Sequence, residues 1–268
     1  MQNHEDYRRL AVEKHGSTLI VTLATGHKAN ALCFETMHEL TSLANLVAED
    51  MSIAAVVLAG KDGVFTSGMD LSALDRPEEL APNFQERRRN AALGAKMCRA
   101  WESIEAITIA AIEGPCVGGG VALSLALDLR VCAKGSWLYV PEIERGMNMS
   151  WQSVPRSVAL IGPAKTKRML VLAERVSAEL ALSWGWADYE CDTGESVAQA
   201  TALAARVGKM PPIPARMCKQ AINASSGALH HAVSYMDADQ LLLTHHTEDF
   251  REGVASFLEK REPNYKGN

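Results

Sequence analysis

The chain has 268 residues, a hydrophobic fraction of 47% and a formal net charge of −5. This length and composition allow a full buried core and do not suit a disordered chain, and the absence of a long basic run speaks against nucleic-acid binding. Six scattered cysteines without a CxxC pair, an N-terminus without an apolar signal segment and the lack of any long apolar stretch predict a reduced, cytoplasmic protein with no membrane span.

Short β-branched runs alternate with helical patterns in the first half of the chain. In chain order we expect a strand at 18–23, a helix at 33–49, a strand at 53–58, a helix at 86–104, a strand at 107–112, a helix at 119–127 and a strand at 129–133. Strands separated by helices predict βαβ crossovers and therefore an α/β fold with a mainly parallel sheet. The polar segment bracketed by Pro77 and Pro82 predicts a surface loop.

The β pattern fades beyond about residue 154. Helices are expected at 164–172, 177–184, 195–207, 214–224, 230–246 and 248–260. The last part of the chain is therefore a helical appendage to the sheet, and prolines at 211, 212 and 214 mark a break between two of its helices.

The most informative segment is residues 113–128, which read EGPCVGGGVALSLALD. Here a buried strand ends and a helix opens on three glycines, so that unpaired backbone N–H groups face whatever lies at the helix start. The glycines could equally serve only to let helix and strand pack closely. A dinucleotide-binding turn lacks its last glycine here, and the GK[ST] of a P-loop is absent.

A second glycine turn follows the expected strand at 53–58, in the sequence VFTSGMDL of residues 64–71. Ligands of open α/β sheets bind at the carboxyl ends of the strands, where both glycine turns are expected to lie. Together the two turns could supply two N–H donors to one oxygen, as an oxyanion hole requires.

These segments resemble the enoyl-CoA hydratase/isomerase (crotonase) family over nearly the whole chain. The resemblance rests on Asn30 to Leu32, the sequence FTSGMDL from Phe65, the GGG from Gly118, the Pro-Glu pair ending at Glu142, and the tail from Glu252 to Pro263. It implies a spiral of ββα repeats, with an acyl-CoA-binding core at 1–200 and a helical oligomerisation region at 201–268. It also implies an oxyanion hole formed by the N–H groups of Met69 and Gly119.

The resemblance also bears on the acid/base group. Relatives that hydrate enoyl-CoA usually carry one glutamate just after GGG and one in the Pro-Glu pair; here the first position is Ala122 and the second is Glu142. A carboxyl group in an apolar pocket has a raised pKa, which suits proton transfer near neutral pH. Glu144 and Arg145 are expected to be surface or salt-bridge residues.

Further substrate contacts follow from the same motifs. Residues 146–155 read GMNMSWQSVP, where many relatives have small, flexible residues, so that Trp151 is expected to narrow an acyl pocket lined by methionines. The residues expected to contact the acyl-CoA are Ala31, Ser67, Gly68, Asp70, Leu71, Gly118, Ala122, Met147, Ser150, Trp151, Phe257 and Lys260.

The helical tail resembles the segment that meets the adenine end of coenzyme A, often from a neighbouring subunit, which implies a homotrimer or a dimer of trimers. Histidine pairs at 230/231 and 245/246 do not predict a metal site, because adjacent residues on a helix point in different directions. No metal or redox cofactor is expected, and coenzyme A enters as part of the substrate.

One carboxylate and an oxyanion hole are enough to move a double bond, and the resemblance to single-glutamate isomerases favours this activity. Two alternatives stay open: hydration or hydratase-lyase cleavage of a bulky or aromatic enoyl-CoA, and acyl-CoA binding without turnover.

Overall fold

The computed structural model describes residues 7–70 and 83–268. The predicted contact Leu71 and the predicted loop from Pro77 to Pro82 lie outside these residues. The described strands are β1 (Leu10–His15), β2 (Thr18–Leu23), β3 (Ala55–Ala59), β4 (Ile107–Ile112), β5 (Pro115–Val117), β6 (Leu129–Ala133), β7 (Trp137–Tyr139), β8 (Val176–Ser177) and β9 (Tyr189–Cys191).

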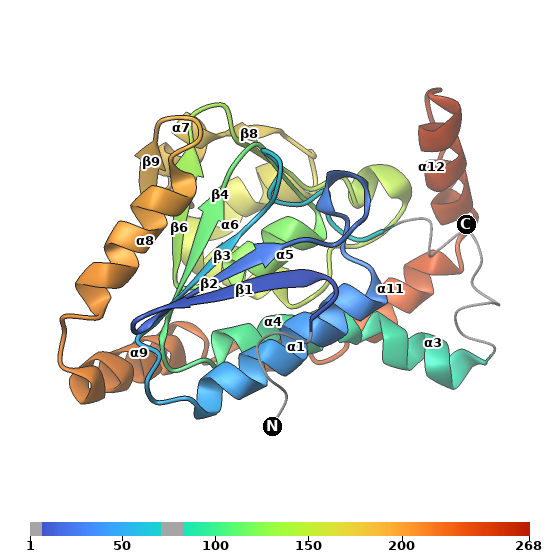
Figure 1. Ribbon diagram of the computed structural model, residues 1–268. Coiled ribbons are helices and arrows are strands. Elements are labelled where there is room, and N and C mark those ends of the chain that lie inside the picture. The colour runs from blue at the N-terminus through green and yellow to red at the C-terminus, as the bar shows by residue number, and fades with distance from the viewer. Residues whose placement is uncertain (1–6, 71–82) are drawn as a thin grey trace.

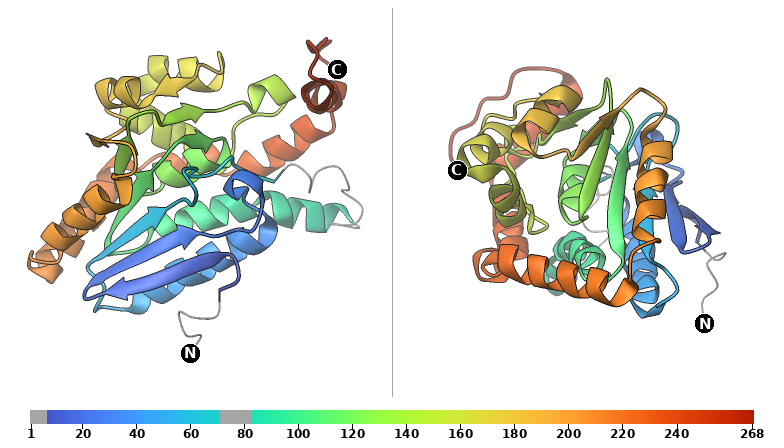
Figure 2. Two further views of the ribbon diagram at one scale, coloured as in Figure 1. Left: turned by 45° about the horizontal axis from the view of Figure 1, so that its top comes forward. Right: turned by 90° about the vertical axis from the view of Figure 1, so that its left-hand side faces the viewer.

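The helices connect these strands and then continue to the C-terminus. They are η1 (Lys28–Asn30), α1 (Phe34–Glu49), α3 (Phe84–Ala91), α4 (Leu93–Glu102), α5 (Gly119–Leu125), η3 (Ile143–Arg145), α6 (Ser153–Leu170), α7 (Ala178–Trp184), α8 (Ser196–Val207), α9 (Pro212–Ser226), α10 (His230–Ser234), α11 (Asp237–His245) and α12 (Glu248–Glu259). Figures 1 and 2 show α12 at the opposite end of the molecule from α8 and α9.

The strands form two sheets. The larger has the order β1-β2-β3-β4-β6-β9, in which only the β1/β2 pair is antiparallel. The smaller sheet has the order β5-β7-β8, with β5 and β7 parallel. The prediction of an α/β fold with a mainly parallel sheet is confirmed.

Both faces of the large sheet are covered, which explains why β3 is buried along its whole length. Val56 and Leu58 point into the main core, which α1 and α4 close on that face. The alternate residues Ala55, Val57 and Ala59 point to the other face, where α8 packs on them through Ala200 and Leu203. The predicted boundary at residue 200 therefore falls inside α8, a helix that packs on the sheet.

Several predicted elements differ from those observed. Strands β1, β5, β7, β8 and β9 were not predicted, and the last four have only two or three residues, too few for an alternating pattern to register. The predicted helix at 164–172 is the second half of α6, because Gly162 has a non-helical φ of 81° and Pro163 restarts the helix after a kink. The predicted helix at 86–104 is two helices that meet at Ala92, and the one at 230–246 is likewise two.

A buried ion pair fastens α9 to the sheet. Lys219 Nζ lies 2.6 Å from Asp128 Oδ2 and donates to the Ala106 carbonyl at 2.8 Å. The same carboxylate accepts two hydrogen bonds from Thr108. Lys219→Met is expected to lower the free energy of unfolding by about 3–5 kcal/mol, because it leaves a largely buried carboxylate without its cation.

Urea denaturation followed by circular dichroism measures this loss. The matched control is Lys134→Met, which removes an exposed pair with Asp192 and is expected to have a much smaller effect, because water already solvates both charges. Equal losses in the two variants would contradict a stabilising role for the Lys219 pair.

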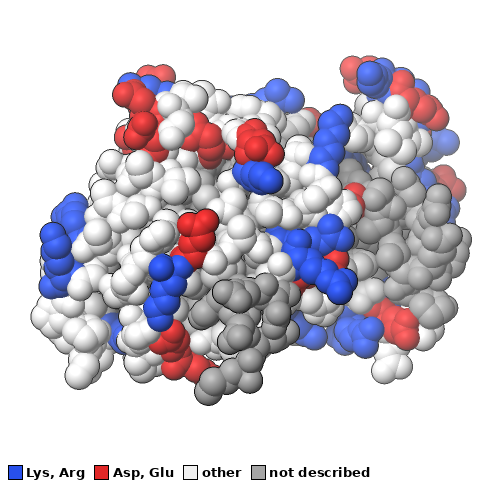
Figure 3. Space-filling model, in the orientation of Figure 1, with Lys and Arg blue, Asp and Glu red and all other residues white. Residues whose placement is uncertain are grey.

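The surface carries both charge signs. On the face in Figure 3, lysine and arginine side chains are interspersed with aspartate and glutamate rather than gathered into one broad patch of either sign. In the described part of the chain, no helix combines the length and the apolar character needed to cross a bilayer.

Candidate active site

The two glycine turns predicted from the sequence lie side by side. The chain segment after β3 runs along β5: Phe65 N–H donates to the Glu113 carbonyl at 2.8 Å, and Val117 N–H donates to the Thr66 carbonyl at 3.0 Å. This pairing brings Gly68 next to Gly118, where β5 ends and α5 begins.

Two backbone N–H groups at this junction are available to a ligand. Leu32 pairs with both neighbours of Met69, donating to the Gly68 carbonyl at 2.8 Å and accepting from Asp70 N–H at 3.1 Å, so that the Met69 N–H is not used in that bridge. Gly119 is the first residue of α5, and no hydrogen-bond acceptor for either N–H is found among the described residues. A side chain at Gly119 would place its Cβ 3.4 Å from Met69 N, so the two donors lie around one small space. This is the arrangement of an oxyanion hole.

Glycine is required at both turns for steric reasons. Gly68 has a φ of +84°, and a Cβ there would lie 2.6 Å from the Val117 carbonyl oxygen. Gly118 has a φ of +50°, and its Cβ would lie 2.5 Å from Glu142 Oε1. Both the left-handed backbone and the close neighbours exclude a side chain.

Asn30 explains the Asn-Ala-Leu motif. Its backbone is left-handed, and its side-chain amide donates to the carbonyls of Lys61 and Val64 at 3.0 and 2.8 Å. Its own carbonyl accepts from the Thr66 hydroxyl, which in turn accepts from Gly68 N–H at 3.1 Å. Asn30 therefore holds the loop that presents the Met69 N–H, and Ala31 lines the site beside it.

Glu142 reaches the same space from the small sheet. Gly118 N–H donates to the Tyr139 carbonyl at 2.8 Å, which fixes the end of β7 against the glycine turn, and Glu142 follows three residues later. Its Oε2 is buried and has no hydrogen-bond partner among the described residues. Burial raises the pKa of Glu142 to about 7, against the opposing effects of its own backbone N–H and of Arg145.

This pKa predicts a pH dependence. Because Glu142 must be ionised to accept a proton, kcat/KM is expected to fall tenfold per pH unit as the pH is lowered below about 7, and to level off above it. Arg145→Met should move the midpoint to higher pH, because the cation lowers the pKa of Glu142. Initial rates between pH 5 and 9 measure both midpoints, and a wild-type midpoint near the value of a solvated glutamate would contradict the burial of this group.

A cavity of about 450 Å³ opens in front of these groups. Eleven of the predicted site residues line it: Ala31, Ser67, Met69, Asp70, Gly118, Gly119, Glu142, Met147, Ser150, Trp151 and Phe257. Two of them are carboxyl groups: Asp70, whose Oδ2 lies 3.2 Å from His27 Nδ1, and Glu142, whose Oε2 has no hydrogen-bond partner among the described residues.

Three predicted contacts lie elsewhere. Gly68 is buried within its turn. Ala122 is fully buried in the core and does not line the cavity, because its face of α5 packs inward, so its contact with the acyl-CoA stays a prediction. Lys260 is exposed at the C-terminal end of α12, away from the cavity lining of its own chain, and its contact with coenzyme A stays a prediction.

Sequence reasoning missed one end of the cavity. Arg145 was expected to be a surface or salt-bridge residue, and its Nη1 does lie 3.9 Å from Glu144 Oε2. Its side chain is only 9% exposed, however; it stacks on Phe257 of α12 at 4.1 Å and lines the cavity. Arg175 stacks on Trp137 and Tyr139, which also line it. Glu144 is half exposed and accepts a hydrogen bond from the Tyr139 hydroxyl. The short strand β7 brings these aromatic rings into the site, and the sequence alone did not reveal that strand.

The fold and the site define an α/β protein in which two backbone N–H groups and a buried carboxyl group face one cavity. A model of the enoyl-CoA hydratase/isomerase family matches residues 13–268, and the chain belongs to this family. It is 26% identical over 260 residues to a crotonyl-CoA hydratase of Syntrophomonas wolfei, covering 97% of this chain and 98% of that protein.

Solved structures agree with the fold. An enoyl-CoA hydratase from Mycobacterium avium subsp. paratuberculosis superposes with a TM-score of 0.86 at 21% identity, covering 96% of this chain and 98% of that one. Pseudomonas aeruginosa DspI superposes with a TM-score of 0.77 at 29% identity, covering 99% of each chain. The predicted crotonase-like fold is confirmed.

Proposed function

We propose that this acyl-CoA enzyme shifts a double bond between the 3- and 2-positions of an enoyl-CoA, with Glu142 as acid and base. The observation that carries the proposal is that the Met69 and Gly119 N–H groups and the Glu142 carboxyl group face the same cavity. The position at which hydratases carry a second glutamate is the buried Ala122. Glu142 is then the group that must both remove and return the proton.

In the proposed reaction the thioester oxygen accepts hydrogen bonds from the two N–H groups. The carboxylate of Glu142 removes a proton from C2 of a 3-enoyl thioester, and the electron pair spreads over C2 to C4 and the thioester oxygen as a dienolate. The two donors stabilise the negative charge on that oxygen. The protonated Glu142 returns the proton at C4, which leaves the double bond between C2 and C3. No metal or redox cofactor takes part, and coenzyme A is the carrier of the acyl group.

Hydration of a 2-enoyl-CoA is the second candidate, and the names of the relatives favour it. The relative from Syntrophomonas wolfei is a crotonyl-CoA hydratase, and another at 25% identity, from Clostridium acetobutylicum, is a short-chain-enoyl-CoA hydratase. In this reaction Glu142 would activate water for attack at C3 without help from a second glutamate, on a simple or an aromatic enoyl group. Acyl-CoA binding without turnover is the non-enzymatic alternative.

Mass spectrometry of the products distinguishes these functions. Isomerisation of a 3-enoyl-CoA gives a conjugated product of unchanged composition, which chromatography separates from its substrate, whereas hydration adds the mass of one water. We expect the first result from a 3-enoyl-CoA and little change of a 2-enoyl-CoA. Addition of water to the 2-enoyl-CoA would establish the hydratase instead, and tight binding of both esters without conversion would establish the non-enzymatic alternative.

We also propose that the protein assembles as a homotrimer or a dimer of trimers through its C-terminal helices. Support comes from large apolar side chains exposed along α9 to α12: Ile213, Met217, Ile222, Leu229, Val233, Leu243 and Leu258. In such an assembly Lys260 of one subunit could meet the coenzyme A phosphates of the next. Sedimentation velocity would show a trimer or hexamer, and a monomer would contradict the proposal.

A further inference from the structure

Trp151 has an unusual backbone conformation for a large residue. Trp151 and Gln152 both have left-handed backbones, with φ values of 60° and 59°. This region is costly for residues with a Cβ, and two in succession persist only where their surroundings hold them. The structure shows what holds them.

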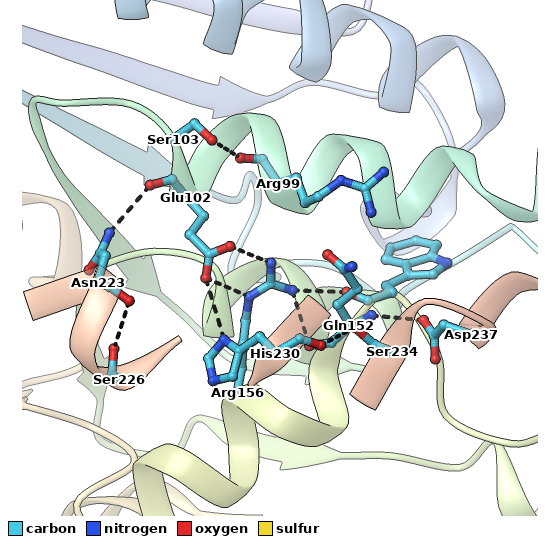
Figure 4. Close-up of polar contacts among 11 residues, drawn as sticks. Arg99, Glu102, Ser103, Gln152, Arg156, Asn223, Ser226, His230, Ser234 and Asp237 are labelled. Carbon is cyan, nitrogen blue, oxygen red and sulfur yellow. Dashed lines mark hydrogen bonds and ion pairs between the residues drawn. The ribbon is translucent and has the colours of Figure 1, made fainter. Parts of the chain in front are cut away.

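A polar clamp grips both peptide groups (Figure 4). Asp237, at the start of α11, accepts from Gln152 N–H at 2.8 Å. Arg156 of α6 donates from Nη1 to the carbonyls of Trp151 and Gln152 at 3.0 and 3.1 Å. Glu102, the last residue of α4, holds Arg156 by two hydrogen bonds, from Nε at 3.0 Å and from Nη2 at 2.7 Å. Three helices therefore converge on this one turn.

In this turn the Trp151 indole lies between two glycines, Gly94 and Gly119. A Cβ on Gly94 of α4 would lie 2.0 Å from Cε2 of the indole, and a Cβ on Gly119 would lie 2.6 Å from its Cη2 and Cζ3. Trp151 is only 6% exposed, and the accessible part of this residue lines the cavity beside the two N–H donors. Carbons attached to a thioester carbonyl held by Gly119 N–H would therefore lie against this ring.

We propose that Trp151 is a specificity-determining residue that admits acyl groups without a branch next to the thioester carbonyl, and that Asp237, Arg156 and Glu102 are positioning residues for it. This inference rests on the proposed acyl-CoA site but not on which reaction occurs there. The indole blocks the space that a substituent on C2 would need. The clamp keeps the indole from turning aside.

Calorimetric binding of two saturated esters tests the proposal without turnover. Wild type is expected to bind butyryl-CoA at least about tenfold more tightly than 2-methylpropanoyl-CoA, the discrimination that one misplaced methyl group gives. Trp151→Ala should bring the two affinities close to equality. Retention of the wild-type ratio by Trp151→Ala would overturn the specificity role.

The positioning role has its own variants. Asp237→Ala should lower the ratio as Trp151→Ala does, whereas Asp237→Asn, which keeps an acceptor oxygen, should preserve most of it. Gly94→Ala tests the position of the indole independently, because it leaves every clamp hydrogen bond in place and displaces the ring by steric contact. It should lower the ratio as well, and it can be measured even if Asp237→Ala fails to fold. When combined with Trp151→Ala, neither Asp237→Ala nor Gly94→Ala should alter the affinity ratio further, because the indole through which both act is absent.

The outcomes separate this inference from the proposed function. A lower melting temperature with an unchanged ratio in Asp237→Ala would overturn the positioning role. An unchanged ratio in Gly94→Ala would overturn the placement of the indole. If wild type bound neither ester, the proposed acyl-CoA function would fail and this inference with it, whereas tight binding of both esters with equal affinity would overturn this inference alone.

Discussion

Replacing Glu142 with glutamine is expected to reduce kcat by about 10²- to 10⁴-fold, the usual contribution of a general acid/base group. The amide has nearly the same volume but cannot accept a proton, so affinity for a saturated acyl-CoA should stay close to that of wild type. Steady-state kinetics and calorimetry measure the two effects separately.

Glu144→Gln is the matched control. Glu144 lies two residues away, is half exposed and hydrogen-bonds Tyr139 rather than lining the cavity. This variant should keep most of the wild-type rate. A Glu142→Gln enzyme with the full rate, or a Glu144→Gln enzyme with the larger loss, would show that the acid/base group has been misassigned.

Gly119→Ala is expected to lower kcat/KM by about 10²- to 10³-fold, the cost of one lost oxyanion-hole hydrogen bond, because the methyl group keeps the thioester oxygen away from the retained N–H. Its Cβ would lie 3.4 Å from Met69 N and 2.6 Å from the Trp151 ring, in the space that the thioester oxygen needs. Because alanine suits a helix start at least as well as glycine, α5 should still form, with the Trp151 ring displaced to admit the methyl group.

Thermal unfolding of Gly119→Ala separates the two possible causes of a low rate. A melting temperature near that of wild type, combined with the expected loss of rate, would locate the defect in the oxyanion hole. A normal rate would contradict the role of the Gly119 N–H.

The sequence predicted the fold where its patterns were long. The run from Ala55 to Ala59 has no polar residue because both faces of β3 are covered, and this pattern identified a parallel strand. The short strands β5, β7, β8 and β9 were not predicted, because two or three residues are too few to show an alternating pattern. Strands β5, β7 and β8 pair with one another and β9 pairs with β6, contacts that only the folded chain reveals.

For the site, residues that act through the backbone were the easiest to predict. Gly118 and Gly119 stand out because nothing larger fits where strand and helix meet, and Met69 follows from the second glycine turn. The burial of Arg145 was not predicted, because it depends on α12, more than a hundred residues later, packing on η3. Likewise, the clamp on Trp151 joins the nearby Arg156 to Glu102 and Asp237 from two helices distant in the sequence, and no local motif marks it.

The central claim is that one carboxyl group beside an oxyanion hole moves a proton within an enoyl thioester. The most direct test follows the absorbance of the conjugated thioester after wild-type protein is added to a 3-enoyl-CoA and, separately, to a 2-enoyl-CoA, with Glu142→Gln beside it. We predict a rise with the 3-enoyl-CoA that disappears in the variant. A fall with the 2-enoyl-CoA, and no rise with the 3-enoyl-CoA, would contradict isomerisation and establish that Glu142 activates water without a second glutamate.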